Sequence, residues 1–175
     1  MELLPNEMWY VITKYLNNKD LISILLVCRK FRDNPYVEKE INNRLKELDW
    51  REISARNTFS EVFVDKYYDY FYLHALFMNK IFTETFLRRN AYRLDWDLVS
   101  YTQVLSESFI RDFQNEVNWK YISRWQKLSE TFMEEFKEKI NLHRISMYQK
   151  VSKEFIQKYR DKIGWNGLVK FNIKS

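Results

Sequence analysis

The feature that most constrains this chain is a pattern that recurs every 23 residues over most of its length. A Trp or Leu opens each period, an aliphatic residue follows three places later, and a Phe follows thirteen places later. The Phe column is unbroken, at Phe63, Phe86, Phe109, Phe132 and Phe155. Self-similarity at one period is typical of solenoids, in which each repeat covers the apolar face of its neighbour. The pattern predicts five repeats without an insertion, at 49–71, 72–94, 95–117, 118–140 and 141–163.

Each repeat carries signals for two short helices. Asp49, Asp95 and Asn118 precede a Trp and are suited to cap the first helix. Hydroxyl residues later in the repeat are suited to cap the second, namely Ser60, Thr83, Ser106, Ser129 and Ser152. A second reading treats Ser-x-x-Gln as a capping box and begins that helix earlier, at Ser100, Ser123 and Ser146. We favour the later start.

The segment before the repeats is a second unit of pattern, from Leu4 to Arg32. Pro5 suits the first turn of a helix, where the missing N–H is not needed. One helical face follows, formed by Met8, Val11, Ile12, Tyr15 and Leu16. The polar run 17–19 interrupts the pattern, and a second apolar run begins at Leu21. A segment of this length buries few apolar groups alone, so some of them must face a partner or the rest of the chain.

This segment resembles the F-box, whose pattern begins Leu-Pro-x-Glu and ends Val-Cys-Arg-Lys. The matching residues occur in order and without gaps: Leu4-Pro5-Asn6-Glu7, Ile12, Tyr15-Leu16, Asp20-Leu21, Leu25-Leu26 and Val27-Cys28-Arg29-Lys30. One departure is Phe31, where many members of the family have Trp. The resemblance implies docking on the Skp adaptor of cullin–RING ubiquitin ligases. The implied docking residues are Leu4, Pro5, Ile12, Leu16, Leu21, Leu25, Val27, Cys28 and Phe31.

The repeats carry a second resemblance. The phrase Asn/Asp-Trp-x-x-Ile-Ser, followed by Gln-x-Leu-Ser-Glu-x-Phe-Ile, is similar to repeat arrays in proteins of giant DNA viruses. Some of those proteins also carry F-box-like N-termini. The phrase matches best over 95–140 and degrades over 72–94.

The predicted fold is therefore all-α, with a three-helix F-box followed by a solenoid of about five two-helix repeats of 23 residues. The chain has only two Gly and two Pro, which argues against a turn-rich β protein. We predict an F-box at 1–34, a linker helix at 35–48, the repeats at 49–163 and a C-terminal cap at 164–175.

Charge and residue types exclude several function classes. The net charge of +5 is spread along the chain, with 19 Lys/Arg and 17 Asp/Glu over 49–163, and forms no concentrated basic stripe for nucleic acid. His74, His143 and Cys28 are too few and too far apart in sequence for a metal site. The only glycines are Gly164 and Gly167, so there is no Gly-rich phosphate loop. We expect no enzyme activity, no cofactor and no metal.

The chain also lacks sequence signals for a membrane. It has no run of eighteen apolar residues and no N-terminal basic region followed by an apolar core. A single Cys makes no internal disulfide, which suits a reducing compartment. We expect a soluble protein of the cytoplasm or nucleus, in the host cell if the protein is viral.

The most variable repeat positions lie five and six places after the opening Trp or Leu. Large side chains gather there, including Tyr101, Arg124, Trp125 and Tyr148. Such residues are enriched at binding hot spots, so we predict a target-binding surface at this row. The leading hypothesis is a substrate-receptor subunit of a Skp–cullin–F-box ligase, which holds an unknown target protein. The alternatives are a competitor that occupies adaptors, a nucleic-acid-binding repeat protein and a plain scaffold.

Overall fold

The computed structural model describes residues 6–18, 20, 21, 23, 34–55, 59–162 and the backbone of 172–173. These residues are mostly helical, which confirms an all-α repeat protein after the N-terminal segment. The chain divides into two compact units, Met1–Lys80 and Ile81–Ser175, which we call unit 1 and unit 2. The division falls within the predicted repeat 72–94. The predicted domain boundaries at 34, 48 and 163 stay predictions.

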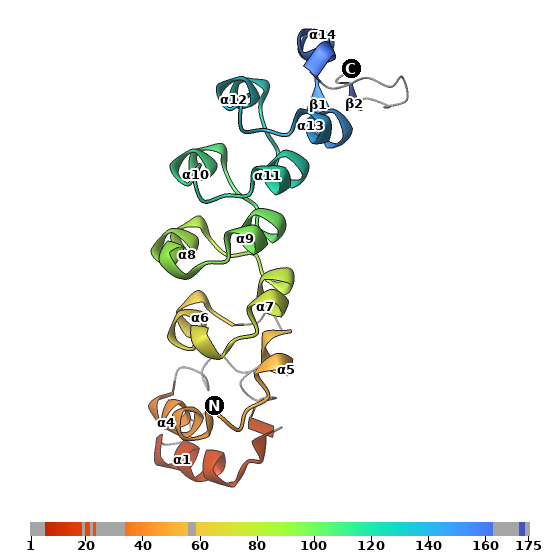
Figure 1. Ribbon diagram of the computed structural model, residues 1–175. Helices are drawn as coiled ribbons and strands as arrows, with labels where there is room; N and C mark the ends of the chain where they lie inside the picture. The colour runs from red at the N-terminus through yellow and green to blue at the C-terminus, as the bar shows by residue number, and fades with distance from the viewer. Residues whose placement is uncertain are drawn as a thin grey trace, which may run out of the picture. The chain divides into compact units, whose positions relative to one another are not determined.

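Unit 1 contains five α-helices and one 3-10 helix among its described residues. They are α1 (Asn6–Tyr15), α4 (Pro35–Arg44), α5 (Trp50–Ser54), α6 (Glu61–Lys66), η1 (Tyr68–Tyr70) and α7 (Leu73–Asn79). Helix α1 packs against α4, and α5 packs against α7 (Figure 1). The helix predicted after Pro35 is therefore present, and it ends at Arg44.

Aromatic rings from the first repeat form much of the core of unit 1. Phe59 and Phe63 stack with their ring centroids 4.9 Å apart, and Phe71 meets Trp50 edge-on at 5.2 Å. Tyr67 lies 4.8 Å from Phe63 and is almost fully buried. Its burial, followed by the charge of Glu38, raises the pKa of Tyr67 to about 12. The Phe and Trp columns of the first repeat thus meet within one cluster.

Unit 2 repeats a simple arrangement of paired helices. Its elements are α8 (Glu84–Arg89), η2 (Ala91–Arg93), α9 (Trp96–Thr102), α10 (Glu107–Asp112), α11 (Trp119–Trp125), α12 (Glu130–Glu135), α13 (Leu142–Tyr148), β1 (Lys150–Val151), α14 (Lys153–Tyr159), η3 (Arg160–Lys162) and β2 (Asn172–Ile173). Helices α9, α11 and α13 form one column, and α8, α10 and α12 form the other (Figure 1). We call these the α11 column and the α10 column.

Side-chain caps fix where these helices begin. Asp95 and Asn118 accept hydrogen bonds from the first turns of α9 and α11, as predicted. Each second helix begins after the predicted hydroxyl, which accepts from the backbone N–H of the Phe three places later. These hydroxyls belong to Ser60, Thr83, Ser106, Ser129 and Ser152. The later start of the second helix is confirmed, and the earlier capping-box reading is wrong.

The Ser and Gln of the rejected capping box join successive repeats instead. The Ser100 hydroxyl accepts the backbone N–H of Asn118 at 2.9 Å, and Ser123 accepts that of Asn141 at 2.8 Å. The buried residues Gln103, Gln126 and Gln149 form a chain of bonds that we call the Gln ladder. Gln126 Nε2 donates to the Gln103 carbonyl, and Gln149 Nε2 donates to the Gln126 carbonyl, both at 2.7 Å.

The other end of each Gln amide satisfies a backbone donor. Gln103 Oε1 accepts the N–H of Phe82 at 2.8 Å, and Gln126 Oε1 accepts the N–H of Leu105 at 2.9 Å. A buried backbone N–H without a partner would destabilise the fold, so the ladder serves both side chain and backbone. One amide per repeat therefore fixes the spacing of neighbouring repeats.

The end of unit 2 has a short strand pair. β1 pairs in parallel with β2, so that Lys150 lies opposite Asn172 and Val151 opposite Ile173. The rest of the predicted cap at 164–175 lies outside the described residues. The two-residue strands are a small addition to the all-α prediction.

Candidate protein-binding surfaces

The N-terminal segment leaves an apolar stripe of α1 exposed. Met8, Val11 and Tyr15 lie on one side of the helix, and 47 %, 53 % and 81 % of their surfaces are exposed. The predicted docking residues Ile12 and Leu16 are half-buried at the edge of this stripe. An exposed apolar stripe on a helix is suited to contact with another protein.

The other predicted docking residues are placed differently. Leu21 is fully buried, which favours a role in packing over direct contact with an adaptor. The remaining six lie outside the described residues: Leu4, Pro5, Leu25, Val27, Cys28 and Phe31. The docking set read from the sequence omitted Met8, Val11 and Tyr15. Their helical spacing was the signal that could have included them.

Arg44 of α4 fixes α1 in place. Its guanidinium donates to the backbone carbonyl of Leu16 at 2.6 Å and to that of Thr13 at 3.3 Å. These carbonyls lie at the end of α1, where helical partners run out and the helix dipole is negative. Arg44 Nε also forms a salt bridge with Glu40 Oε1 at 2.7 Å, and both side chains are largely buried. The exposed stripe is therefore presented by a fixed helix.

Comparison with known proteins bears on this segment. Residues 1–33 match the family model of the F-box domain. The F-box match covers the predicted docking residues and α1, and ends just before α4. Neither the curated proteins nor the solved structures provide a match to this chain. The match supports the predicted F-box, and the repeats rest on the geometry described above.

A second candidate surface lies on the α11 column of unit 2. The predicted target-binding residues Tyr101, Trp125 and Tyr148 are 41 %, 48 % and 41 % exposed. Tyr101 meets Trp125 edge-on, with ring centroids 5.6 Å apart. Tyr101 and Trp125 thus pack against each other across neighbouring repeats, and all three rings remain partly open to solvent.

Arg124, the fourth predicted residue, joins two of these rings. Its guanidinium carbon lies 4.5 Å from the centroid of the Trp125 ring and 4.6 Å from that of the Tyr148 ring. Contact of a guanidinium with aromatic faces is attractive and restricts its orientation. In the part of the chain that the structure describes, Arg124 Nε is buried and has no hydrogen-bond partner.

Further cations surround Arg124. A hollow of about 320 Å³ is lined by Lys120, Arg124, His143, Arg144 and Tyr148, among others. Sequence reasoning did not single out Lys120 or Arg144. The absence of acids around them could have identified these two cations, because the stretches 118–129 and 141–152 contain no Asp or Glu. We call this surface, made by Lys120, Arg124, Trp125, Arg144 and Tyr148, the cationic face.

Several charges of the α10 column are paired across repeats. Arg111 forms two hydrogen bonds with Glu135, at 2.8 and 2.7 Å. Glu134 accepts from Lys158 Nζ and from the Tyr159 hydroxyl, each at 2.7 Å, and these bonds hold the pKa of Glu134 below its usual value. Burial, then the bond to Glu134, raises the pKa of Tyr159 to about 12. This column therefore links repeats through its charges.

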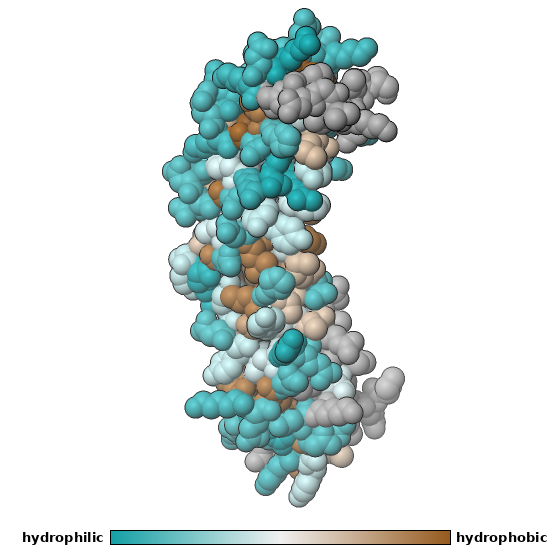
Figure 2. Space-filling model, turned by 45° about the vertical axis from the view of Figure 1, so that its right-hand side comes forward, coloured by the Kyte–Doolittle hydropathy of each residue, from teal (hydrophilic) through white to brown (hydrophobic). Residues whose placement is uncertain are grey.

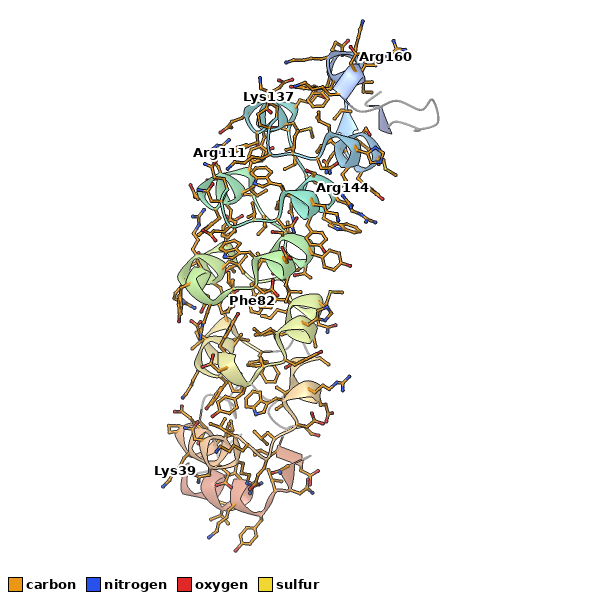
Figure 3. All side chains as sticks on the ribbon, viewed as in Figure 1. Lys39, Phe82, Arg111, Lys137, Arg144 and Arg160 are labelled. Atoms are coloured by element: carbon orange, nitrogen blue, oxygen red, sulfur yellow. The ribbon has the colours of Figure 1, made fainter. Side chains whose placement is uncertain are left out.

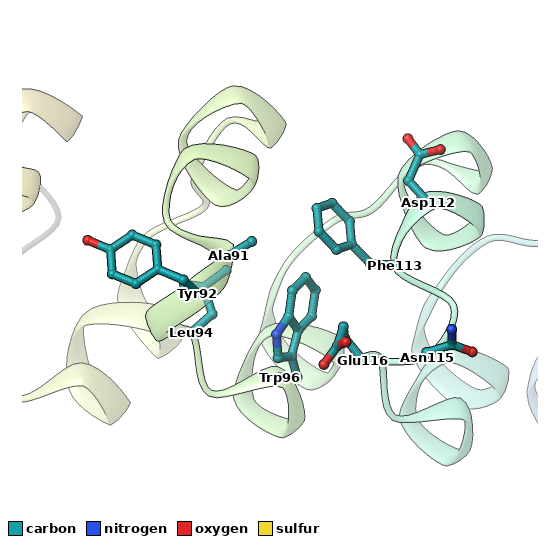
Figure 4. A pocket seen from close by; sticks show the side chains of 8 residues that line it. All are labelled: Ala91, Tyr92, Leu94, Trp96, Asp112, Phe113, Asn115 and Glu116. Carbon is teal, nitrogen blue, oxygen red and sulfur yellow. The ribbon is translucent and has the colours of Figure 1, made fainter.

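A larger hollow of about 490 Å³ lies beside the turn η2. Trp96 and Phe113 face each other in it, with ring centroids 4.8 Å apart, while Tyr92 points away (Figure 4). Asp112 at its rim is paired with Arg88 at 2.7 Å. The hollow therefore lies between packed repeats and is lined by these rings and by Asp112, Asn115 and Glu116.

Two further findings concern metal sites and membrane-spanning helices. Among the described residues, no three His, Cys, Asp or Glu side chains converge so as to hold a metal ion. Within the same residues, no helix is both long enough and apolar enough to cross a membrane. Figure 2 shows apolar side chains reaching the visible surface in separate patches among hydrophilic ones.

Proposed function

We propose that this chain is a substrate-receptor subunit of a Skp–cullin–F-box ubiquitin ligase. The observation that carries the proposal is the exposed stripe Met8–Val11–Tyr15 within the stretch that matches the F-box model. F-box domains typically bind the Skp adaptor, and an apolar helical stripe suits such a contact. The protein itself would perform no catalysis, which other subunits of the ligase would supply.

The repeats would hold the target protein. Each repeat buries its Phe and aliphatic columns against its neighbours, so the positions that vary are left for recognition. The aromatic row of the α11 column remains exposed and has the composition of a hot spot. A viral origin, suggested by the repeat phrase, would make the target a host protein.

Capture of the purified Skp adaptor by the full chain tests the first half of the proposal. We expect the wild-type chain to retain the adaptor. The double variant Leu4→Ala/Pro5→Ala and the single variant Tyr15→Ala should retain less, because each removes apolar surface from the docking segment. Tyr92→Ala removes an equally exposed Tyr from unit 2 and serves as the matched control.

Two results would contradict adaptor docking: no capture by the wild-type chain, or equal capture by all variants. Ubiquitination of a bound protein in a reconstituted ligase then separates a substrate receptor from a competitor that only occupies the adaptor. A receptor delivers its target for modification, whereas a competitor binds the adaptor and yields no modified protein.

A further inference from the structure

The two columns of unit 2 differ in charge. The stretch 118–129, which contains α11, carries Lys120, Arg124 and Lys127, and the stretch 141–152, which contains α13, carries Arg144 and Lys150. Neither stretch contains an acid. The α10 column carries several acids, of which Glu134 and Glu135 are paired with cations of neighbouring repeats. Figure 3 shows Arg144 on the side of α11 and α13, and Arg111 and Lys137 on the side of α10 and α12. The stretches 118–129 and 141–152, which contain α11 and α13, therefore carry cations and no acid.

From this separation we propose that the cationic face binds a short acidic segment of another protein, through its Asp and Glu carboxylates. This proposal extends the proposed function. It rests on that function only in assigning the acidic segment to a target protein of the ligase. Arg124 is the central contact, with Lys120 and Arg144 beside it along the same hollow. Trp125 and Tyr148 provide exposed ring surface for apolar side chains of the segment.

Arg124 is prepared for a carboxylate. The rings of Trp125 and Tyr148 hold its guanidinium between neighbouring repeats, which reduces the conformational entropy lost on binding. Its Nε is buried without a partner among the described residues, and an unsatisfied buried donor is unfavourable. Because this nitrogen is enclosed, a carboxylate would accept from the other N–H groups of the guanidinium and form a charge-assisted hydrogen bond.

The extent of the face favours a short peptide segment over a nucleic acid. The preceding repeat carries Asp95 as the cap of α9 and Asp97 within α9, and the stretch 95–106 contains no Lys or Arg. The positive surface therefore spans two repeats and ends at an acidic one. A nucleic acid strand carries a charge at every nucleotide and gains affinity by neutralising many of them, which a face of this size does not do. A few clustered carboxylates match it.

Fluorescence anisotropy with the full chain tests the proposal. The probe is a short fluorescein-labelled peptide of alternating Glu and Leu. Three comparison probes are the same peptide with Gln for Glu, the same peptide with phosphoserine for Glu, and a single-stranded RNA of equal length. We expect the Glu peptide to bind and the Gln peptide to bind about tenfold more weakly or not at all, because the carboxylates carry the contact.

Variants assign the binding to Arg124. Arg124→Ala should weaken binding of the Glu peptide about tenfold or more, as for an interface hot spot. Arg124→Lys keeps the charge but lacks the planar fork of the guanidinium, so it should restore only part of the loss. Lys137→Ala, which removes an exposed cation from the α10 side, should change the affinity less than twofold. Unchanged unfolding midpoints of the variants would show that they fold.

Several results would overturn the proposal. They are equal binding of the Glu and Gln peptides, equal loss with Arg124→Ala and Lys137→Ala, full binding by Arg124→Lys, or tighter Arg124-dependent binding of the RNA or of the phosphoserine peptide. Adaptor capture distinguishes this proposal from the proposed function. A chain that captures the adaptor but not the Glu peptide defeats only the inference, and the reverse result defeats only the proposed function.

Discussion

Units 1 and 2 hold their helices together with buried polar groups in two different ways. In unit 1, one guanidinium, that of Arg44, serves several carbonyls at the end of α1 and is held by Glu40. In unit 2, the same kind of work is divided among amides, because Gln103, Gln126 and Gln149 each satisfy groups of neighbouring repeats. Unit 1 thus relies on the single guanidinium of Arg44 for several buried hydrogen bonds, whereas unit 2 relies on one amide in each repeat.

From this comparison we expect that a buried polar group with more hydrogen-bond partners contributes more to the free energy of unfolding. Removal of Arg44 leaves a buried carboxylate and several carbonyls without a donor at once. Removal of one ladder amide leaves fewer, uncharged groups without partners. Three substitutions, taken from the largest expected effect to the smallest, test this difference.

Arg44→Ala should destabilise unit 1 by about 3 kcal/mol, because it breaks a largely buried ion pair and leaves the end of α1 uncapped. Urea unfolding measured by circular dichroism gives the free energy change. Arg44→Lys keeps the charge without the fork and should lose less. An unfolding free energy equal to that of the wild type would show that Arg44 does not hold α1.

Gln126→Ala should destabilise unit 2 by about 2 kcal/mol, because the Leu105 N–H and the carbonyl of Gln103 lose their partners in a buried place. Hydrogen exchange of the Leu105 amide reports the change locally and should become faster. The control is Gln157→Ala, an exposed Gln of α14, for which we expect a change below about 0.5 kcal/mol. Equal effects of the two substitutions would contradict the ladder.

Glu134→Gln should have the smallest effect, below about 1 kcal/mol, because the ion pair of Glu134 with Lys158 is largely open to solvent. The pKa of Glu134 is lowered in the folded state, so its contribution is present above the ordinary value of 4.5 and is lost as the pH falls through the folded value. The unfolding free energies of wild type and variant should therefore converge at acid pH. A difference that persists there, or that Glu116→Gln reproduces, would contradict the assignment.

Local patterns in the sequence predicted much of the fold. The Phe column predicted which side chains are buried, and the hydroxyls before it predicted where each second helix begins, because both depend on a few neighbouring residues. The aromatic row was predicted from the repeat spacing, which places Trp125 and Tyr148 around one guanidinium. Periodicity carries such information because equivalent positions in stacked repeats become neighbours.

Other features depend on contacts between residues that are far apart in the sequence, and local sequence patterns do not identify such contacts. The Ser-x-x-Gln spacing is compatible with a capping box, and only the stacked structure shows that Gln126 reaches the preceding repeat. Arg44 was an ordinary cation in a predicted linker helix, although its partners lie 28 to 31 residues earlier. The exposure of Met8 and the burial of Leu21 likewise follow from which helices pack together. Long-range pairing of this kind is a property of the assembled chain.

The Gln ladder has a consequence for how such a protein changes length over generations. Gln126 and Gln149 meet the preceding repeat through the same atoms at the same interval, so Gln149 could take the position of Gln126 if residues 118–140 were deleted as a block. Duplication of the same block would likewise leave every amide matched. We therefore expect changes in whole multiples of the period to keep the buried amides matched, whereas a shift of register within the stack would place them against other atoms.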